Sequence, residues 1–311
     1  MVATVLPQSP EPHQQVASLP ATPETGEAKP SEQDYFLSQN PTEIERLSYQ
    51  HEVIKDYMGG KLVLAPVDFS QSGLHIFDSA TADGLWLRDL QSSLPEQDNN
   101  LNTYTGIDIV PSYFPTPQPQ STTLVVHNMT TPYPASWTGH FDLVHQRLAL
   151  PGCGNYPLRS AVASLVTLLK PGGWIQLLEA DHSGPGSEGL ATKDAFKLIK
   201  ELFRKSGIDY EYAQLMKGWL LEMGLEEVEE RVLDVPLGKS NAKKEMGEMG
   251  ARSFGSATAG LVAFAKSVST SFSVEELNGL AVHVERELTN VGGVHRIYAV
   301  WGRRPMMVNN A

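Results

Sequence analysis

One stretch of the chain constrains its fold more than any other: LHIFDSATADGLWLRDL, residues 74–90. An apolar run ends at Asp78, small residues follow, and apolar residues at helical spacing resume after Gly84. This order predicts a strand, a tight turn and a helix. In an open α/β sheet a nucleotide-like ligand binds at such a turn, because small residues let backbone N–H groups approach it and the helix N-terminus adds partial positive charge. The usual G-x-G-x-x-G spacing is absent, so the turn alone is a weak signal.

Composition and charge limit the function classes. A chain of 311 residues, 41% of them hydrophobic, can bury one large α/β core with additions. The net charge of −12 repels phosphate backbones and anionic membranes, so we expect neither nucleic acid nor membrane as a partner. Cys153 is the only cysteine, which excludes an intrachain disulfide and favours a cytoplasmic location. We expect no bound metal, no signal peptide and no membrane-spanning helix.

The chain divides into segments by its composition. Residues 1–33 are rich in Pro, Gln, Glu, Ser and Thr and have no apolar stripe, which predicts a disordered tail. Residues 34–60 carry apolar side chains at roughly helical spacing, which predicts an N-terminal helical lid. We expect residues 61–304 to form the main domain, with a helical insertion at 239–292 before the last strand. Residues 305–311 are expected to form a short tail.

Strand and helix patterns alternate along the main domain. Strands are predicted at 74–78, 102–110, 122–126, 141–144, 174–178, 228–235 and 295–301, and helices at 84–90, 157–169, 191–205 and 212–223. Such alternation predicts an α/β fold with a doubly wound parallel sheet. Three prolines in the segment 112–120 leave little room for a crossover helix, so we expect a loop or short turn there.

Several motifs, in this order, resemble a known family. They are DSATADG at the first turn, Asp108 after the second strand, FDLVHQR, LKPGGWIQLLEAD and HRIYAVWGR. Together they are similar to class I S-adenosylmethionine-dependent methyltransferases. The segment DYFLSQNPTEIERLSYQHEVIKDYMGG and the turn DSATADGLWLRDL resemble fungal secondary-metabolism methyltransferases, including the gliotoxin-type N-methyltransferases.

The resemblance covers residues 34–304. It implies a Rossmann-like seven-stranded sheet whose last strand is antiparallel, and S-adenosylmethionine as the cofactor. The chain departs from the family's common D-x-G-x-G-x-G, because Ala80 and Ala82 stand at two of the glycine positions. An alanine is still small enough to permit a close backbone approach.

The parts of this cofactor call for different partners. Asp108 is suited to accept two hydrogen bonds from the ribose hydroxyls. The side-chain oxygen of Asn128 is suited to the adenine amino group, with Met129 packed on the ring. The backbone of residues 79–81 would face the methionine tail. The full set of cofactor-binding candidates is Tyr35, Asp78, Ser79, Ala80, Thr81, Gly84, Asp108, Ile109, Asn128, Met129, His145 and Gln146.

Methyl transfer from a sulfonium requires alignment, exclusion of water and at most one base. His145 and His182 are the candidate catalytic bases, because both lie at carboxyl ends of predicted strands and imidazole titrates near neutrality. For each of them, the alternative to a catalytic role is a structural role as a hydrogen-bonded histidine. Tyr49, like Tyr35, lies on the N-terminal addition, where it would close over the cofactor or pack in the core.

The segment 246–291 lies where methyltransferases place acceptor-binding elements. Its apolar side chains indicate either a neutral, apolar acceptor or a simple cover for the sheet; they are Met246, Met249, Phe254, Leu261, Phe264 and Phe272. We therefore expect a methyltransferase that acts on nitrogen or oxygen of an apolar small molecule in secondary metabolism. A methyltransferase-like regulator with protein partners and a cofactor-binding cyclase remain alternatives, and the oligomeric state is open.

Overall fold

The computed structural model describes residues 42–95, 101–119, 121–184, 186–187 and 189–306. The predicted disordered tail and Tyr35 lie outside the described residues. Among the helices in these ranges, none combines the length and hydropathy that a membrane crossing requires.

A seven-stranded sheet forms the centre of the molecule, in the order β3-β2-β1-β4-β5-β7-β6. The strands are β1 (His75–Ser79), β2 (Thr103–Asp108), β3 (Thr122–Val126), β4 (Phe141–Arg147), β5 (Leu169–Ala180), β6 (Glu226–Leu237) and β7 (Gly293–Arg303). Strands β1 to β5 are parallel, and β7 is antiparallel to both β5 and β6. The predicted doubly wound sheet with an antiparallel last strand is confirmed.

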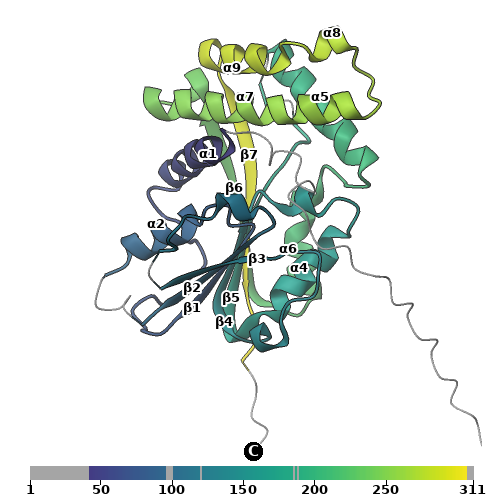
Figure 1. Cartoon of the computed structure of the whole chain (residues 1–311). Helices are drawn as coiled ribbons and strands as arrows, with labels where there is room; N and C mark the ends of the chain where they lie inside the picture. The colour runs from purple at the N-terminus through teal and green to yellow at the C-terminus, as the bar shows by residue number, and fades with distance from the viewer. Residues whose placement is uncertain (1–41, 96–100, 120, 185, 188, 307–311) are drawn as a thin grey trace, which may run out of the picture.

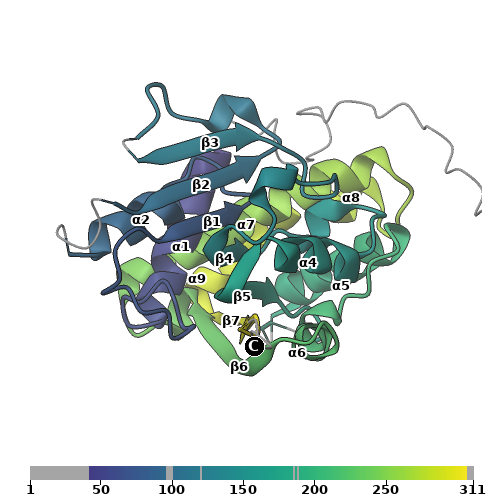
Figure 2. The ribbon, with the colours of Figure 1, turned by 90° about the horizontal axis from the view of Figure 1, so that it is seen from below.

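Helices cover both faces of this sheet (Figure 2). They are α1 (Glu43–Tyr57), α2 (Leu85–Ser93), α4 (Leu158–Thr167), α5 (Leu190–Lys205), α6 (Tyr212–Glu222), α7 (Lys244–Ser267), α8 (Val274–Leu277) and α9 (Leu280–Asn290), with 3-10 turns η2 (Pro111–Tyr113), η3 (Ala135–Trp137), η4 (Leu150–Cys153) and η5 (Gly238–Ser240). In residues 111–119, the part of the proline-rich segment that the structure describes, the turn η2 is the only helical element, as the prolines predict.

The strand β5 begins earlier than its apolar run predicts. Leu169 already pairs with Phe141, and the register then shifts before Trp174 pairs with Leu143. The Lys-Pro-Gly-Gly segment between these pairs is therefore part of the strand's irregular start, and it does not end the preceding helix, because α4 already ends at Thr167.

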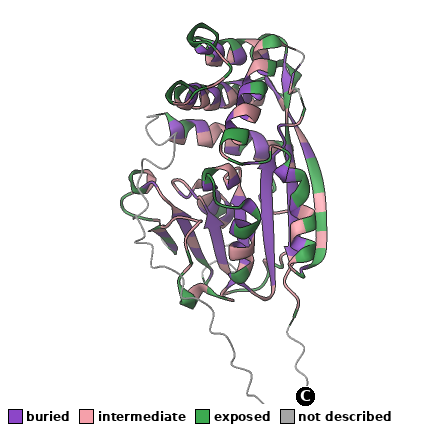
Figure 3. Cartoon of the chain, turned by 90° about the vertical axis from the view of Figure 1, so that its right-hand side faces the viewer, coloured by how far each residue is buried: buried purple, intermediate pink, exposed green. Residues whose placement is uncertain are grey.

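Two hydrophobic clusters occupy the two faces of the sheet. On one face, α4 and α6 place Val162 and Met216 in a cluster that includes Val144. On the other face, α2 places Trp86 in a cluster that includes Leu143. Neighbouring residues of β4 thus point to opposite clusters, as the two-residue period of a strand requires. Figure 3 shows the buried residues concentrated in the strands and the inner helix faces.

The helical insertion and α1 gather at one end of the sheet (Figure 1). Helix α7 contacts both α9 and α1. Gly255 lets α7 approach α9 closely, since a Cβ there would lie 2.8 Å from the Cβ of Glu285. The hydroxyl of Ser253 on α7 donates to the carbonyl of Arg46 on α1 at 3.2 Å. The insertion is helical, as predicted, and it holds α1 over the sheet.

Candidate active site

The carboxyl ends of the parallel strands open into a cavity of about 840 Å³. This size lies within the range of small-molecule sites. The wall formed by the sheet includes Ala80, Asp108, Asn128, Met129, Arg147 and Glu179, and the opposite wall, from α1, α5 and α7, includes Arg46, Val53, Leu202, Phe254, Leu261 and Phe264. The cavity thus combines polar side chains at the strand ends with apolar side chains from α5 and α7.

The turn after β1 has an unusual backbone. Ala80 and Ala82 both adopt left-handed conformations, with φ of 53° and 52°. The hydroxyl of Thr81 donates to Asp78 Oδ2 at 2.6 Å, and this hydrogen bond ties the turn to the end of β1. Gly106 on β2 makes room for this arrangement, because a Cβ there would lie 2.7 Å from Thr81 Cγ2. The turn thus exposes its backbone to the cavity at the positions where the resemblance has glycines.

Asp108 lines the cavity at the end of β2. Its Oδ2 accepts a hydrogen bond from the backbone N–H of Ala82 at 2.8 Å, and its Oδ1 accepts one from the N–H of Val110 at 3.0 Å. Burial raises the pKa of Asp108, although these backbone donors oppose the shift. Each oxygen keeps a lone pair for a ligand hydroxyl, so this residue fits the ribose diol of S-adenosylmethionine.

Asn128 also lines the cavity, but its side-chain oxygen is already in use. Asn128 Oδ1 accepts hydrogen bonds from the backbone N–H and the hydroxyl of Thr130, at 2.9 and 2.8 Å. An adenine amino group that donates to this oxygen, as expected, would therefore compete with the two donors of Thr130. The amide Nδ2 is the atom better placed to serve a ligand, as a donor to a ring nitrogen.

The other predicted cofactor residues divide between the cavity wall and the interior. Ile109 and Met129 line the cavity. Ser79 is fully buried, and Gly84 precedes α2 in a left-handed conformation without lining the cavity. Tyr49 donates its hydroxyl to Glu45 on its own helix and is not part of the cavity wall.

Asp78 and His145 lie beneath the turn and do not line the cavity. His145 Nδ1 lies 2.7 Å from Asp78 Oδ1, and the imidazole stacks on Trp86 with ring centroids 3.7 Å apart. Only 1% of His145 is exposed. Burial lowers its pKa, so the ring is neutral near pH 7. The structure places His145 beneath the turn and outside the cavity wall, so of the two candidate bases His182 is the one that lines the cavity.

His182 follows β5 and does line the cavity. The rings of Phe196 and Phe203 meet it edge-on at centroid distances of 5.7 and 5.4 Å, and His295 lies at 6.3 Å. Burial lowers the pKa of His182 to about 3 and that of His295 to about 4. Both imidazoles are therefore neutral. Within the described residues, Nδ1 of His182 is buried without a hydrogen-bond partner.

The buried carboxylate of Glu179, which the sequence analysis did not single out, organises the loop after β4. It accepts hydrogen bonds from the side chain of Gln146, the backbone N–H groups of Ala149 and Leu150, and the hydroxyl of Tyr212, at 2.8–3.0 Å. Burial raises the pKa of Glu179, while these donors oppose the shift. Gln146 is thereby turned into the interior and does not line the cavity.

Arg147 and His295 are further cavity residues that the sequence analysis missed. Arg147 ends β4 and His295 lies near the start of β7. The rule that placed His145 and His182 among the candidates, position at the carboxyl end of a strand, would have found Arg147 but not His295, which lies near the amino end of the antiparallel strand β7. In the insertion, Phe254, Leu261 and Phe264 line the cavity, whereas the other three predicted apolar residues pack in core clusters: Met246, Met249 and Phe272.

Comparisons with known proteins agree with this geometry. The chain is 37% identical to the N-methyltransferase sirN of Leptosphaeria maculans over 283 residues, covering 89% of this chain and 96% of the relative. It is 34% identical to the N-methyltransferase gliN of Aspergillus fumigatus, covering 88% and 98%. It is 33% identical to the N-methyltransferase verN of Clonostachys rogersoniana, covering 87% and 93%. No family model matches the chain.

A solved structure supports the fold. Haemonchus contortus phosphoethanolamine N-methyltransferase 2, in complex with S-adenosylhomocysteine, is similar with a TM-score of 0.50 at 13% identity, covering 87% of this chain and 59% of that chain. The sheet order and the cavity at its carboxyl end define the class I methyltransferase architecture. On the identity with its relatives, the chain belongs to the fungal S-adenosylmethionine-dependent methyltransferases of secondary metabolism. Its cofactor is S-adenosylmethionine, and the alternatives of a regulator or a cyclase are not favoured.

Proposed function

We propose that this protein transfers the methyl group of S-adenosylmethionine to a nitrogen of an apolar small molecule. The observation that carries the proposal is a cavity that combines polar residues at the strand ends, where the cofactor would bind, with apolar residues from the helical insertion. Phe254, Leu261 and Phe264 are the insertion residues that line it. The relatives named N-methyltransferases support nitrogen as the acceptor atom.

The cofactor end works by positioning. In this proposal Asp108 accepts hydrogen bonds from the ribose hydroxyls, Asn128 and Met129 bind the adenine, and the turn at Ala80 and Ala82 follows the methionine tail. When bound, S-adenosylmethionine supplies a methyl group already activated on a sulfonium. The residues of the chain then have to align the acceptor and exclude water.

His182 is the residue we propose to receive the acceptor proton. Its imidazole is neutral near pH 7, because burial lowers its pKa to about 3, so its lone pair is available without prior deprotonation. Burial also disfavours the imidazolium that would form. The proton that it would receive is the one that the acceptor nitrogen loses after the methyl group, with the positive charge of the sulfonium, has been transferred to that nitrogen.

The experiment uses S-adenosylmethionine with a deuterated methyl group. The purified protein is incubated with it and a small-molecule extract of the producing organism, and mass spectrometry identifies products that gain the labelled methyl. We expect a labelled small molecule whose nuclear magnetic resonance spectrum shows the methyl on nitrogen. Methyl on oxygen would refute the acceptor atom, labelled protein would indicate a regulator, and no transfer would indicate a different reaction.

His182→Gln tests the base, and His283→Gln on α9 is its matched control because His283 is exposed and does not line the cavity. A positioned base contributes on the order of 10²–10⁴-fold in rate. We expect single-turnover transfer to fall by more than about a hundredfold in His182→Gln and to stay unchanged in the control. A His182→Gln variant within about tenfold of the parent would leave alignment as the whole mechanism.

A further inference from the structure

The cavity residues at the strand ends form a row across the sheet. The strand order β3-β2-β1-β4 places Asn128, Asp108, Ala80 and Arg147 in that sequence. In the pairing of β1 with β4, Asp78 lies opposite His145 and Ser79 lies opposite Gln146, and Ala80 and Arg147 are the next residues of their chains at the same edge of the sheet, where both line the cavity. A long ligand with its ribose at Asp108 and its tail at Ala80 therefore ends next to Arg147.

Arg147 has an incomplete set of partners for a half-buried cation. Within the described residues it forms no ion pair, and it donates a hydrogen bond from Nη2 to His51 Nδ1 at 3.1 Å. The carboxylate of Asp78 is occupied by Thr81 and His145. Burial lowers the pKa of Arg147 to about 10, so the guanidinium stays charged near neutral pH. A charge taken out of water is stabilised by an opposite charge with matching hydrogen bonds.

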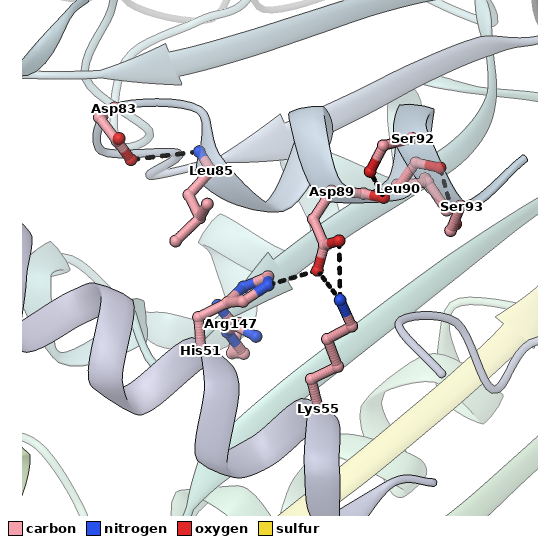
Figure 4. A network of polar contacts seen from close by, with 9 residues as sticks. All are labelled: His51, Lys55, Asp83, Leu85, Asp89, Leu90, Ser92, Ser93 and Arg147. Carbon is pink, nitrogen blue, oxygen red and sulfur yellow. Dashed lines mark hydrogen bonds and ion pairs between the residues drawn. The ribbon is translucent and has the colours of Figure 1, made fainter. Parts of the chain in front are cut away.

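His51 on α1 fixes the position of this guanidinium. Its Nε2 lies 2.7 Å from Asp89 Oδ2, while Lys55 Nζ lies 2.8 Å from Asp89 Oδ1 (Figure 4). Burial and the nearby Arg147 lower the pKa of His51 to about 4. The neutral ring has one donor and one acceptor, a carboxylate only accepts and a guanidinium only donates. His51 therefore donates from Nε2 to Asp89 and accepts from Arg147 at Nδ1.

We propose that Arg147 binds the carboxylate at the end of the cofactor's methionine tail, and that His51 holds the guanidinium in place so that α1 takes part in cofactor binding. The carboxylate is the anion that the ligand brings to this end of the row, and the planar guanidinium matches its two oxygens. Arg147 is a binding residue here and His51 a positioning residue. The inference rests on the placement of the ribose at Asp108 given above.

The test compares two ligands that differ in one group. Calorimetric titration measures the affinity of S-adenosylhomocysteine and of its decarboxylated analogue, which keeps the amino group and lacks the carboxylate. We expect Arg147→Met to weaken binding of S-adenosylhomocysteine by about 10- to 100-fold, and to change binding of the analogue by less than about threefold. His51→Phe should lower the affinity for S-adenosylhomocysteine by a smaller factor, again without affecting the analogue.

Lys55→Met is the matched control, because Lys55 is a cation of the same network that does not line the cavity. It should leave the preference for S-adenosylhomocysteine over the analogue as in the parent. An equal loss for both ligands in Arg147→Met would overturn the proposal, since it would indicate general damage to the cavity. Unchanged affinity for S-adenosylhomocysteine in Arg147→Met would do the same.

The unmodified protein provides a test that needs no variant to fold. It must bind S-adenosylhomocysteine about tenfold or more tightly than the decarboxylated analogue, and equal affinities would refute the role of Arg147. Arg147→Lys, which keeps a charge, should retain part of that preference. All these titrations are made without an acceptor, so methylation of an oxygen instead of a nitrogen would leave their outcome unchanged.

Discussion

Replacing Ala82 by glycine should stabilise the folded protein. Ala82 adopts φ of 52° in the turn after β1, and the left-handed conformation costs an L-residue roughly 1–2 kcal/mol because its Cβ approaches the following carbonyl. Glycine has no Cβ, but it loses about 0.5–1 kcal/mol more conformational entropy on folding. The net gain is therefore about 0–1.5 kcal/mol, and its midpoint of about 0.8 kcal/mol corresponds to an increase in melting temperature of about 1–3 °C for a chain of this size.

The assay is urea unfolding together with thermal melting of the parent and the variant. Ala257→Gly is the matched control, because Ala257 lies inside α7, where glycine costs about 1 kcal/mol relative to alanine. The same chemical change should thus raise stability at the turn and lower it in the helix. A lower melting temperature for Ala82→Gly would refute the reasoning, because the methyl group would then contribute more than the backbone conformation costs.

Two further predictions concern the same end of the sheet. Asp108→Asn should weaken binding of S-adenosylhomocysteine by about 1–3 kcal/mol, because it removes a charged acceptor from the ribose hydroxyls; an unchanged affinity in calorimetry would exclude the ribose role. Gly106→Ala should lower the free energy of unfolding by about 1–3 kcal/mol, because its Cβ would lie 2.7 Å from Thr81 Cγ2. Urea unfolding measures that loss, and full stability would show that Thr81 can move aside.

The sequence predicts much of this fold because its strongest signals are local. The turn after β1, the acid that closes β2 and the helix α5 are each specified by residues close together in the chain, and the structure has all three. Asp108 lines the cavity because carboxyl ends of parallel strands meet at one edge of a sheet. Position along a strand is therefore enough to find a candidate residue.

Position does not reveal which partners surround a side chain. His145 and His182 both follow from the same strand-end rule, yet Trp86 covers the first while the second lines the cavity. The contact of Arg147 with His51 joins residues 96 positions apart. Such contacts depend on how helices pack on the sheet, and local periodicity contains no information about that packing. The resulting burial then sets the pKa values that separate a base from a structural histidine.

The stability of this protein should decrease in mild acid, and His182 should account for part of the loss. Its pKa is about 3 in the folded chain because of burial, and about 6.5 in an unfolded chain. Between these values the unfolded chain binds a proton that the folded chain does not, so protonation favours unfolding. The contribution of the neutral His182 to the free energy of unfolding is therefore complete above about pH 6.5 and is lost progressively as the pH falls towards 3.

The magnitude follows from the two pKa values. At pH 5.5 almost every unfolded molecule carries this proton and almost no folded one does. The titration of His182 therefore lowers the free energy of unfolding by about 1.4 kcal/mol relative to pH 7.5. Urea unfolding of the parent and of His182→Gln at both pH values isolates this cost, because glutamine does not titrate. The parent should lose about 1.4 kcal/mol more than the variant does between these pH values. Equal losses would refute the lowered pKa, because the imidazole would then take up a proton at pH 5.5 as readily within the fold as in the unfolded chain.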